Sequence, residues 1–150
     1  GECVANDAGI LPSILRRSTQ GMESNEMTDR ELLELAAKAA GLNLAEYREE
    51  RNSMYFPFPS ELTDGHWWNP LTDVGDVLRL AVKLGIGVTH YPIFAKPKHS
   101  VIAKIYQSHL DLYRGVSTAI EIIELYNNDQ YAATRRAIVR AAAEIGKAMK

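Results

Sequence analysis

Residues 65–85 read GHWWNPLTDVGDVLRLAVKLG, and they hold both tryptophans followed by the clearest helix in the middle of the chain. Asp73 is a good N-cap residue, because its carboxylate accepts backbone N–H groups that have no partner in the first helical turn. Asp76 follows at the spacing of a capping box. Gly85 suits the left-handed position that ends many helices. The pattern therefore predicts a helix over residues 74–84.

One side of this helix is apolar and is expected to pack on the core, while Asp76, Arg79 and Lys83 lie off that side. The expected apolar face consists of Val74, Val77, Leu78, Ala81 and Leu84.

The two tryptophans precede this helix on backbone that we expect to be extended. Pro70 disfavours helical geometry at Asn69, and neighbouring side chains on an extended chain point to opposite faces. One of Trp67 and Trp68 should therefore enter the core, while the other covers a rim or a partner surface. Core packing and an exposed aromatic hot spot for a partner both stay open as interpretations.

Composition is that of a globular protein with a core of its own. The 150 residues are 46% apolar and 24% charged, both ordinary values. A formal charge of −2 gives no general attraction to nucleic acid or anionic membrane. The single cysteine, Cys3, cannot form an internal disulfide, which fits a reducing cytosol. No apolar run is long enough for a transmembrane helix.

Upstream of the tryptophans, one helix and two less regular segments are expected. Residues 28–31 form a full capping box, and the helix that they open should end at Gly41. Its small residues allow a close approach to a neighbouring sheet or helix. Residues 44–52 are expected to form a short charged helical turn. Residues 55–59 are aromatic, and their prolines confine them to an edge or a loop.

Downstream, three segments have the composition of strands. These are residues 87–94, interrupted by Pro92, and residues 101–106 and 118–126. Gly115 allows a turn between the last two. The expectation is an antiparallel sheet of about three strands packed on two or three helices, an α+β fold.

The last predicted helix covers residues 130–149 after an N-cap at Asp129. Arg136, Arg140 and Lys147 fall in a narrow arc, which indicates either a solvated basic face or a nucleic-acid contact. The buried stripe is expected to consist of Tyr131, Thr134, Ile138, Ala142, Ile145 and Met149.

Residues 1–26 differ in composition from the rest. We interpret them as a vector-derived or upstream extension that is poorly ordered unless it docks. The alternative is a short amphipathic arm of Ile10, Ile14 and Leu15 that grips a partner.

Motifs for catalysis, phosphate binding or metal binding are absent. No enzyme activity, catalytic residue or cofactor is therefore predicted. His90, His99 and His109 flank or enter the predicted strands, but dispersed histidines without a spacing rule do not predict a metal site.

Three separated motifs resemble the phage ABA sandwich domain family, a group of small tailed-phage and prophage proteins. They are residues 27–41, MTDRELLELAAKAAG; residues 68–84, which join WNPLTD to GDVLRLAVKL; and residues 132–146, AATRRAIVRAAAEIG. The resemblance covers about residues 27–150. It implies a phage-encoded protein that acts in a bacterial host cytoplasm, and it implies no activity.

The leading hypothesis is a non-enzymatic phage accessory protein that binds a host or phage macromolecule, with modulation or inhibition of host or defence machinery as one role. A small-ligand or nucleotide sponge is the first alternative, with a pocket near Trp68, Tyr55, Arg79 and His90. Nucleic-acid binding through Arg136, Arg140 and Lys147 is the second alternative, and a homo-oligomer stays open. The candidate binding residues are Trp67, Trp68, Tyr55, Phe58, Arg79 and His90.

Overall fold

The computed structural model describes residues 26–58, 60–63, 65–91, 99–106, 118–126 and 129–149. Within these residues the chain forms three helices and two three-stranded antiparallel sheets, so the predicted α+β class is confirmed. The elements are α3 (Asp29–Ala39), β1 (Glu46–Arg48), β2 (Ser53–Tyr55), β3 (Trp67–Trp68), α4 (Val74–Leu84), β4 (Gly87–Tyr91), β5 (Ser100–Tyr106), β6 (Thr118–Leu125) and α6 (Gln130–Ala148).

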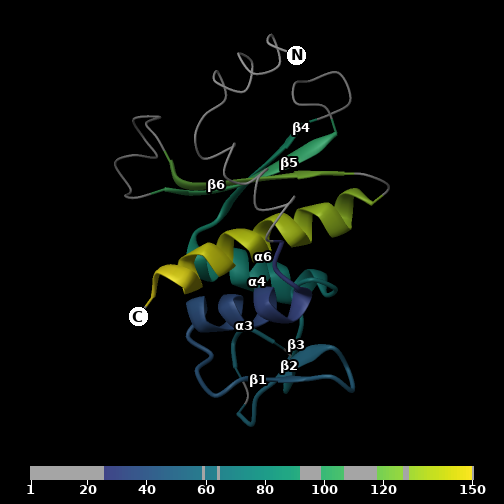
Figure 1. The fold of residues 1–150 in the computed structure, drawn as a ribbon, viewed down its shortest axis with the longest axis vertical. Helices are drawn as coiled ribbons and strands as arrows, with labels where there is room; N and C mark the ends of the chain where they lie inside the picture. Colours follow the sequence, from purple (N-terminus) through teal and green to yellow (C-terminus); the bar gives the residue numbers. More distant parts are fainter. Residues whose placement is uncertain are drawn as a thin grey trace.

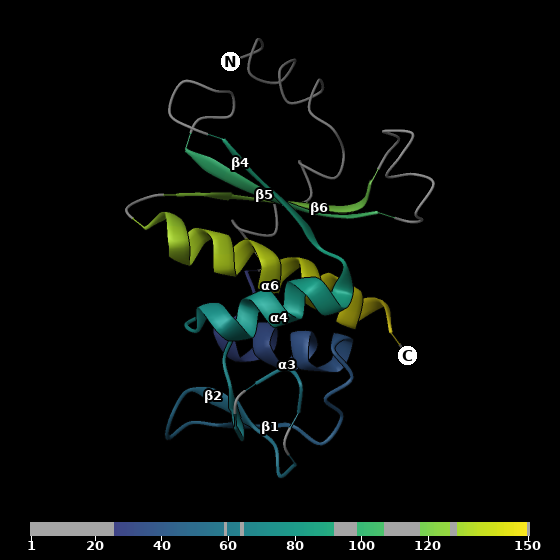
Figure 2. The ribbon, with the colours of Figure 1, turned by 180° about the vertical axis from the view of Figure 1, so that it is seen from behind.

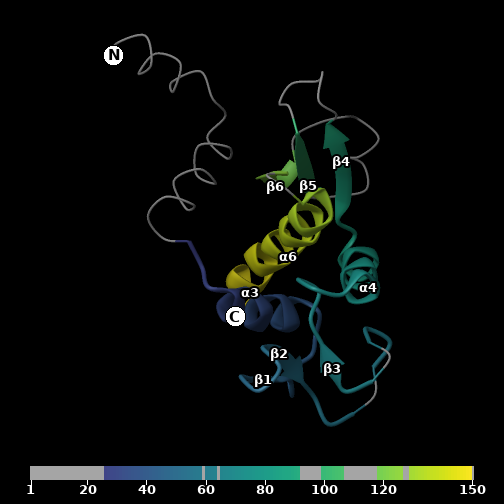
Figure 3. The same cartoon turned by 90° about the vertical axis from the view of Figure 1, so that its right-hand side faces the viewer.

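The elements stack in layers around α6 (Figure 1). Strands β4, β5 and β6, which we call sheet B, cover one side of α6, and α3 and α4 pack on other sides. Strands β1, β2 and β3, which we call sheet A, lie beyond α3. Figure 2 shows the same stack from behind, and Figure 3 shows α4 beside α6 and α3 beneath it. The two sheets therefore occupy opposite ends of the molecule.

Helix α3 begins and ends as its local sequence predicts. The Thr28 hydroxyl oxygen accepts the Glu31 N–H at 3.2 Å, and the Glu31 carboxylate accepts the Thr28 N–H at 2.8 Å. Gly41 has φ of +82°, and the next N–H, of Leu42, bonds to the carbonyl of Ala37 at 2.9 Å. The capping box and the glycine stop are both confirmed.

Helix α4 has the predicted bounds and part of the predicted buried side, since Val77 and Ala81 are buried as expected. Asp73 accepts the Asp76 N–H at 2.7 Å, and Gly85 is left-handed with φ of +68°. Val74 and Leu78, which we expected in the core, are 62% and 61% exposed. The helix turns its acidic side inward because the Asp76 carboxylate is held at the junction with β3. The buried side consists of Asp76, Val77, Leu80 and Ala81.

Helix α6 also has the predicted position, but its expected stripe is confirmed only in part: Ile138 and Ala142 are buried. Tyr131 and Met149 are 68% and 41% exposed. Because α6 lies between layers, it is buried on several sides and not along one stripe. Its buried residues are mainly small: Ala133, Ala137, Ile138, Val139, Ala141, Ala142, Ala143 and Gly146.

Sheet B follows the predicted strand pattern. Val101 and Ala103 of β5 belong to the core cluster and are fully buried. The expected turn around Gly115 and the side chain of His109 lie outside the described residues, as do residues 1–25 with Cys3 and the proposed arm. None of the described helices combines the length and apolarity needed to cross a bilayer.

Sheet A departs from the prediction at residues 44–52 and at Tyr55. Within residues 44–52 the chain forms β1 and a tight turn, not a helical turn. Of the segment 55–59, expected at an edge or in a loop, residues 56–58 do lie outside any strand, whereas Tyr55 ends the central strand β2. The strand stops before Pro57, so the proline does not interrupt the ladder.

Candidate binding surface on sheet A

The register of sheet A decides which tryptophan faces outward. Met54 pairs with Trp68, and Tyr55 pairs with Trp67. Because side chains alternate along a strand, the first pair points into the core and the second points away from it. Trp68 is 0% exposed, while Trp67 and Tyr55 are partly exposed. Trp67 is thus the tryptophan available to a partner.

Four side chains form a continuous row on this outer face. The ring centroids of Tyr55 and Trp67 are 5.2 Å apart with an angle of 60° between the planes. The guanidinium carbon of Arg48 lies 5.0 Å from the Tyr55 centroid, and that of Arg51 lies 4.5 Å from the Trp67 centroid. We call these four residues the arginine–aromatic row. Each cation–π contact at such a site contributes about 0.5–1 kcal/mol.

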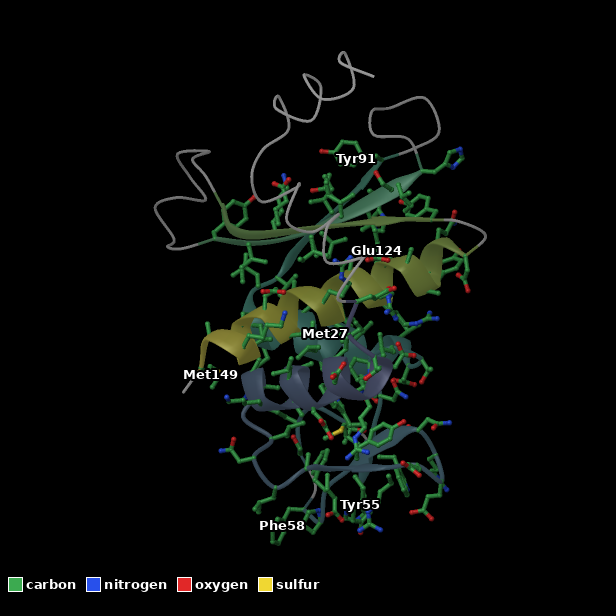
Figure 4. The ribbon with its side chains drawn as sticks, in the orientation of Figure 1. Met27, Tyr55, Phe58, Tyr91, Glu124 and Met149 are labelled. Atoms are coloured by element: carbon green, nitrogen blue, oxygen red, sulfur yellow. The ribbon has the colours of Figure 1, made fainter. Side chains whose placement is uncertain are left out.

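The row lies at the end of the molecule that is formed by sheet A, away from sheet B (Figure 4). Figure 4 shows Tyr55 at the opposite end of the molecule from Tyr91, which belongs to sheet B. His66 extends the aromatic surface, with its ring centroid 5.7 Å from that of Tyr55. The exposed aromatic surface is therefore contiguous, and α3 packs against strands β1 and β2.

Charge on this face is nearly balanced. Arg48 forms an ion pair with Glu46 and a second one with Glu50 at 3.8 Å. A carboxylate oxygen of Glu49 lies 3.9 Å from a guanidinium nitrogen of Arg30. Among the residues that the structure describes, Arg51 has no carboxylate within ion-pair distance. The face therefore presents one arginine without an ion-pair partner beside an aromatic ring.

A hollow of about 350 Å³ opens beside Trp67, between β3 and the start of α4. The Asp76 carboxylate lies in its wall, accepting the Asn69 N–H at 2.9 Å and an Arg79 N–H at 3.3 Å. Burial raises the pKa of Asp76 above its usual value, although the Asn69 bond opposes that shift. The lining residues are Ser53, Thr63, Gly65, His66, Trp67, Trp68, Asn69, Asp73 and Asp76.

The structure separates residues that the nucleotide-pocket hypothesis groups together. His90 lies on β4 in sheet B, where its Nδ1 is 2.9 Å from the Tyr126 hydroxyl. Tyr55 and Trp68 belong to sheet A at the other end of the molecule (Figure 1). A pocket shared by His90 and these residues is not formed. Phe58 is exposed beside a different, more apolar hollow of about 290 Å³ that also involves Leu44.

The three basic residues of α6 are engaged with carboxylates. Arg136 bonds to Asp29 at 2.9 Å, and Lys147 bonds to Glu144 at 3.2 Å. Burial opposes the charge on Arg136, but the hydrogen bond and charge of Asp29 outweigh it, so the pKa of Arg136 is raised. Arg140 is paired with Glu124, and their side chains are only 15% and 12% exposed. The solvated basic face that was one interpretation is wrong for Arg140.

Sequence reasoning missed Arg48 and Arg51. The error followed from the helical turn predicted for residues 44–52, which has no partner strand. A hairpin there would have placed Arg48 on the same face as Tyr55, because the register pairs Arg48 with Ser53 and Glu46 with Tyr55.

Neither metal-ligating clusters nor comparisons with known proteins add a further site. Within the described ranges, no three or more His, Cys, Asp or Glu side chains gather so that they could hold a metal ion. No family model, curated protein or solved structure matches the chain. The similarity to phage ABA sandwich proteins therefore stays a prediction from the three motifs.

Proposed function

We propose that this protein is a non-enzymatic binding protein that recognises a protein partner through the arginine–aromatic row. One observation carries the proposal: Tyr55 and Trp67, on neighbouring strands, are flanked by two arginines on an accessible face. Tyr, Trp and Arg are the residue types enriched at the energetic centres of protein interfaces. Their mutual stacking also limits the side-chain entropy lost on binding.

A protein partner fits the charge of the face better than a nucleic acid. Glu46, Glu49 and Glu50 lie around the row, and nucleic-acid affinity depends on several uncompensated cations. On α6, the alternative basic surface has Arg136 and Arg140 in ion pairs. Binding to nucleic acid is therefore the less favoured proposal.

The resemblance to phage proteins suggests where the partner would be found. We propose a host or phage protein of the bacterial cytoplasm, so that binding modulates or inhibits host or defence machinery. This part of the proposal rests on the three motifs and not on the geometry.

Site-specific photo-crosslinking in bacterial cells, with and without phage infection, tests the proposal. A benzoylphenylalanine at position 67 should give a discrete adduct, while the same group at position 131 should not. Tyr131 is a matched control because it is an exposed aromatic residue on α6, outside sheet A. The Tyr55→Ala, Trp67→Ala double variant should fail to capture the same partner while keeping its melting temperature within a few degrees. Equal adducts from positions 67 and 131, or none from position 67, would overturn the proposal.

Small-ligand binding is a second candidate, and the hollow beside Trp67 favours it. The buried indole N–H of Trp68 is unpaired among the described residues, and buried donors usually have partners. A ligand that binds only the folded state raises the melting temperature. A thermal-shift screen of nucleotides and polar metabolites should show such a rise. The Ser53→Val variant, which narrows a polar wall of the hollow, should lose it. No shift with any compound would remove this candidate.

A further inference from the structure

We infer that the partner of the arginine–aromatic row is a protein segment that presents an Asp or Glu carboxylate to Arg51. This inference rests on the proposed function and specifies the chemistry of the partner. It comes from the contrast between Arg51 and the other arginines near sheet A. All three stack on aromatic rings, but only Arg51 is left without a carboxylate within the described residues.

The contrast is seen contact by contact. Arg30 lies 5.1 Å from the Tyr47 centroid and bonds to Glu34 at 3.0 Å. Arg48 lies over Tyr55 and pairs with Glu46. Arg51 lies closest to its ring, 4.5 Å from the Trp67 centroid. It forms no ion pair and its guanidinium donates no hydrogen bond to any described residue.

The position of Arg51 over the Trp67 ring prepares it for a planar acceptor. Its guanidinium donates no hydrogen bond within the described residues, so its N–H groups stay available to a ligand. Their fork matches the two oxygens of a carboxylate. Since Trp67 already restrains the side chain, less entropy is lost when the ion pair forms.

The surrounding charges favour a single carboxylate over a polyanion. The glutamates nearby are occupied by Arg48 and Arg30, so Arg51 is the arginine of the row that has no carboxylate partner among the described residues. A phosphate backbone would bring repeated negative charges against Glu46, Glu49 and Glu50. One acidic side chain, with an apolar neighbour to cover Tyr55, complements the face without that repulsion.

Selection from a displayed library of random linear peptides tests the inference, with the full chain as bait. Selected peptides should share an Asp or Glu. Their affinity should fall about tenfold to a hundredfold when Arg51 is changed to Gln, as expected for a charge-assisted hydrogen bond. Changing the shared acid to its amide should cause a similar loss, and the two changes together should add little more. Arg51→Lys should cause an intermediate loss, because it keeps the charge but not the fork.

Arg30→Gln is the matched control, because Arg30 also stacks on a ring but already has a carboxylate partner. It should change peptide affinity less than about twofold. Peptides that lose binding with Trp67→Ala but not with Arg51→Gln would overturn this inference and leave the proposed function standing. Peptides indifferent to both variants, or a selection that yields no binder, would count against both.

Discussion

Replacing Gly146 by alanine should destabilise this protein, although the same change usually stabilises a helix. Gly146 lies in α6 where that helix meets α3. A Cβ atom added there would lie 2.2 Å from the Leu35 carbonyl oxygen and 2.9 Å from its carbonyl carbon. These are backbone atoms inside a helix, so they cannot rotate aside as a side chain would.

The magnitude follows from two opposing effects. An ordinary carbon–oxygen contact is about 3.3–3.6 Å, so α3 must move away by about 1 Å. Overpacking of this kind costs about 1–3 kcal/mol, and the separated helices also lose part of their dispersion contacts. The intrinsic gain of alanine over glycine in a helix is about 1 kcal/mol. With overpacking at the upper end of its range, the expected net loss is about 2 kcal/mol.

Thermal and urea unfolding monitored by circular dichroism measure this loss. For a domain of this size, about 2 kcal/mol corresponds to a melting temperature lowered by about 4–8 °C. Gly75→Ala in α4 is the matched control, because the nearest atoms to its Cβ belong to side chains and not to backbone: Asp73 Oδ2, which caps the helix, at 3.1 Å and an Arg79 nitrogen at 3.2 Å. It should melt clearly above Gly146→Ala, because side-chain atoms can shift by the few tenths of an ångström that are needed. If Gly146→Ala melts as high as Gly75→Ala, the close helix approach is refuted.

Three further changes test other parts of the fold. Burial raises the pKa of Asp76, so the stability that its protonated form contributes is present at low pH and declines as pH rises above the unfolded pKa of about 3.9. The unfolding free energy of Asp76→Asn, measured by urea titration, should therefore rise relative to that of the wild type between about pH 3.5 and 7. The opposite trend would contradict the burial argument. Glu124→Gln leaves the Arg140 charge poorly compensated in a mostly buried place and should lower the unfolding free energy by about 3 kcal/mol, whereas a loss near zero would mean that solvent screens the pair. Gly85→Ala places a side chain at φ of +68° with open space around it, so backbone strain alone should lower the unfolding free energy by about 1–2 kcal/mol. An unchanged midpoint of urea unfolding would argue against the left-handed helix end.

Local signals predicted helix ends accurately, because each cap is made within a few residues. Thr28, Asp73 and Asp129 all cap the helices that follow them, and Gly41 and Gly85 end theirs in the left-handed conformation. Such bonds depend on residue type and spacing alone.

Tertiary context decided what the sequence could not. Periodicity can identify one apolar side of a helix, but α6 contacts several layers, and its alanines are compatible with burial on any side. In β1, Glu46 and Arg48 have good helix propensity, yet pairing with β2 determines their conformation. The candidate site was half predicted: Tyr55 and Trp67 follow from extended aromatic segments, whereas Arg51 approaches its ring only because a tight turn brings it there.

The position of α6 has a consequence during translation. It lies between the two halves of the described fold, yet it is the last described element to be synthesised. Until it leaves the ribosome, α3, α4 and the strands of sheet B lack the surface on which they pack, and their apolar sides stay open to chaperones and proteases. Nascent chains arrested before Gln130 should accordingly be cleaved far faster than chains arrested after α6 has emerged.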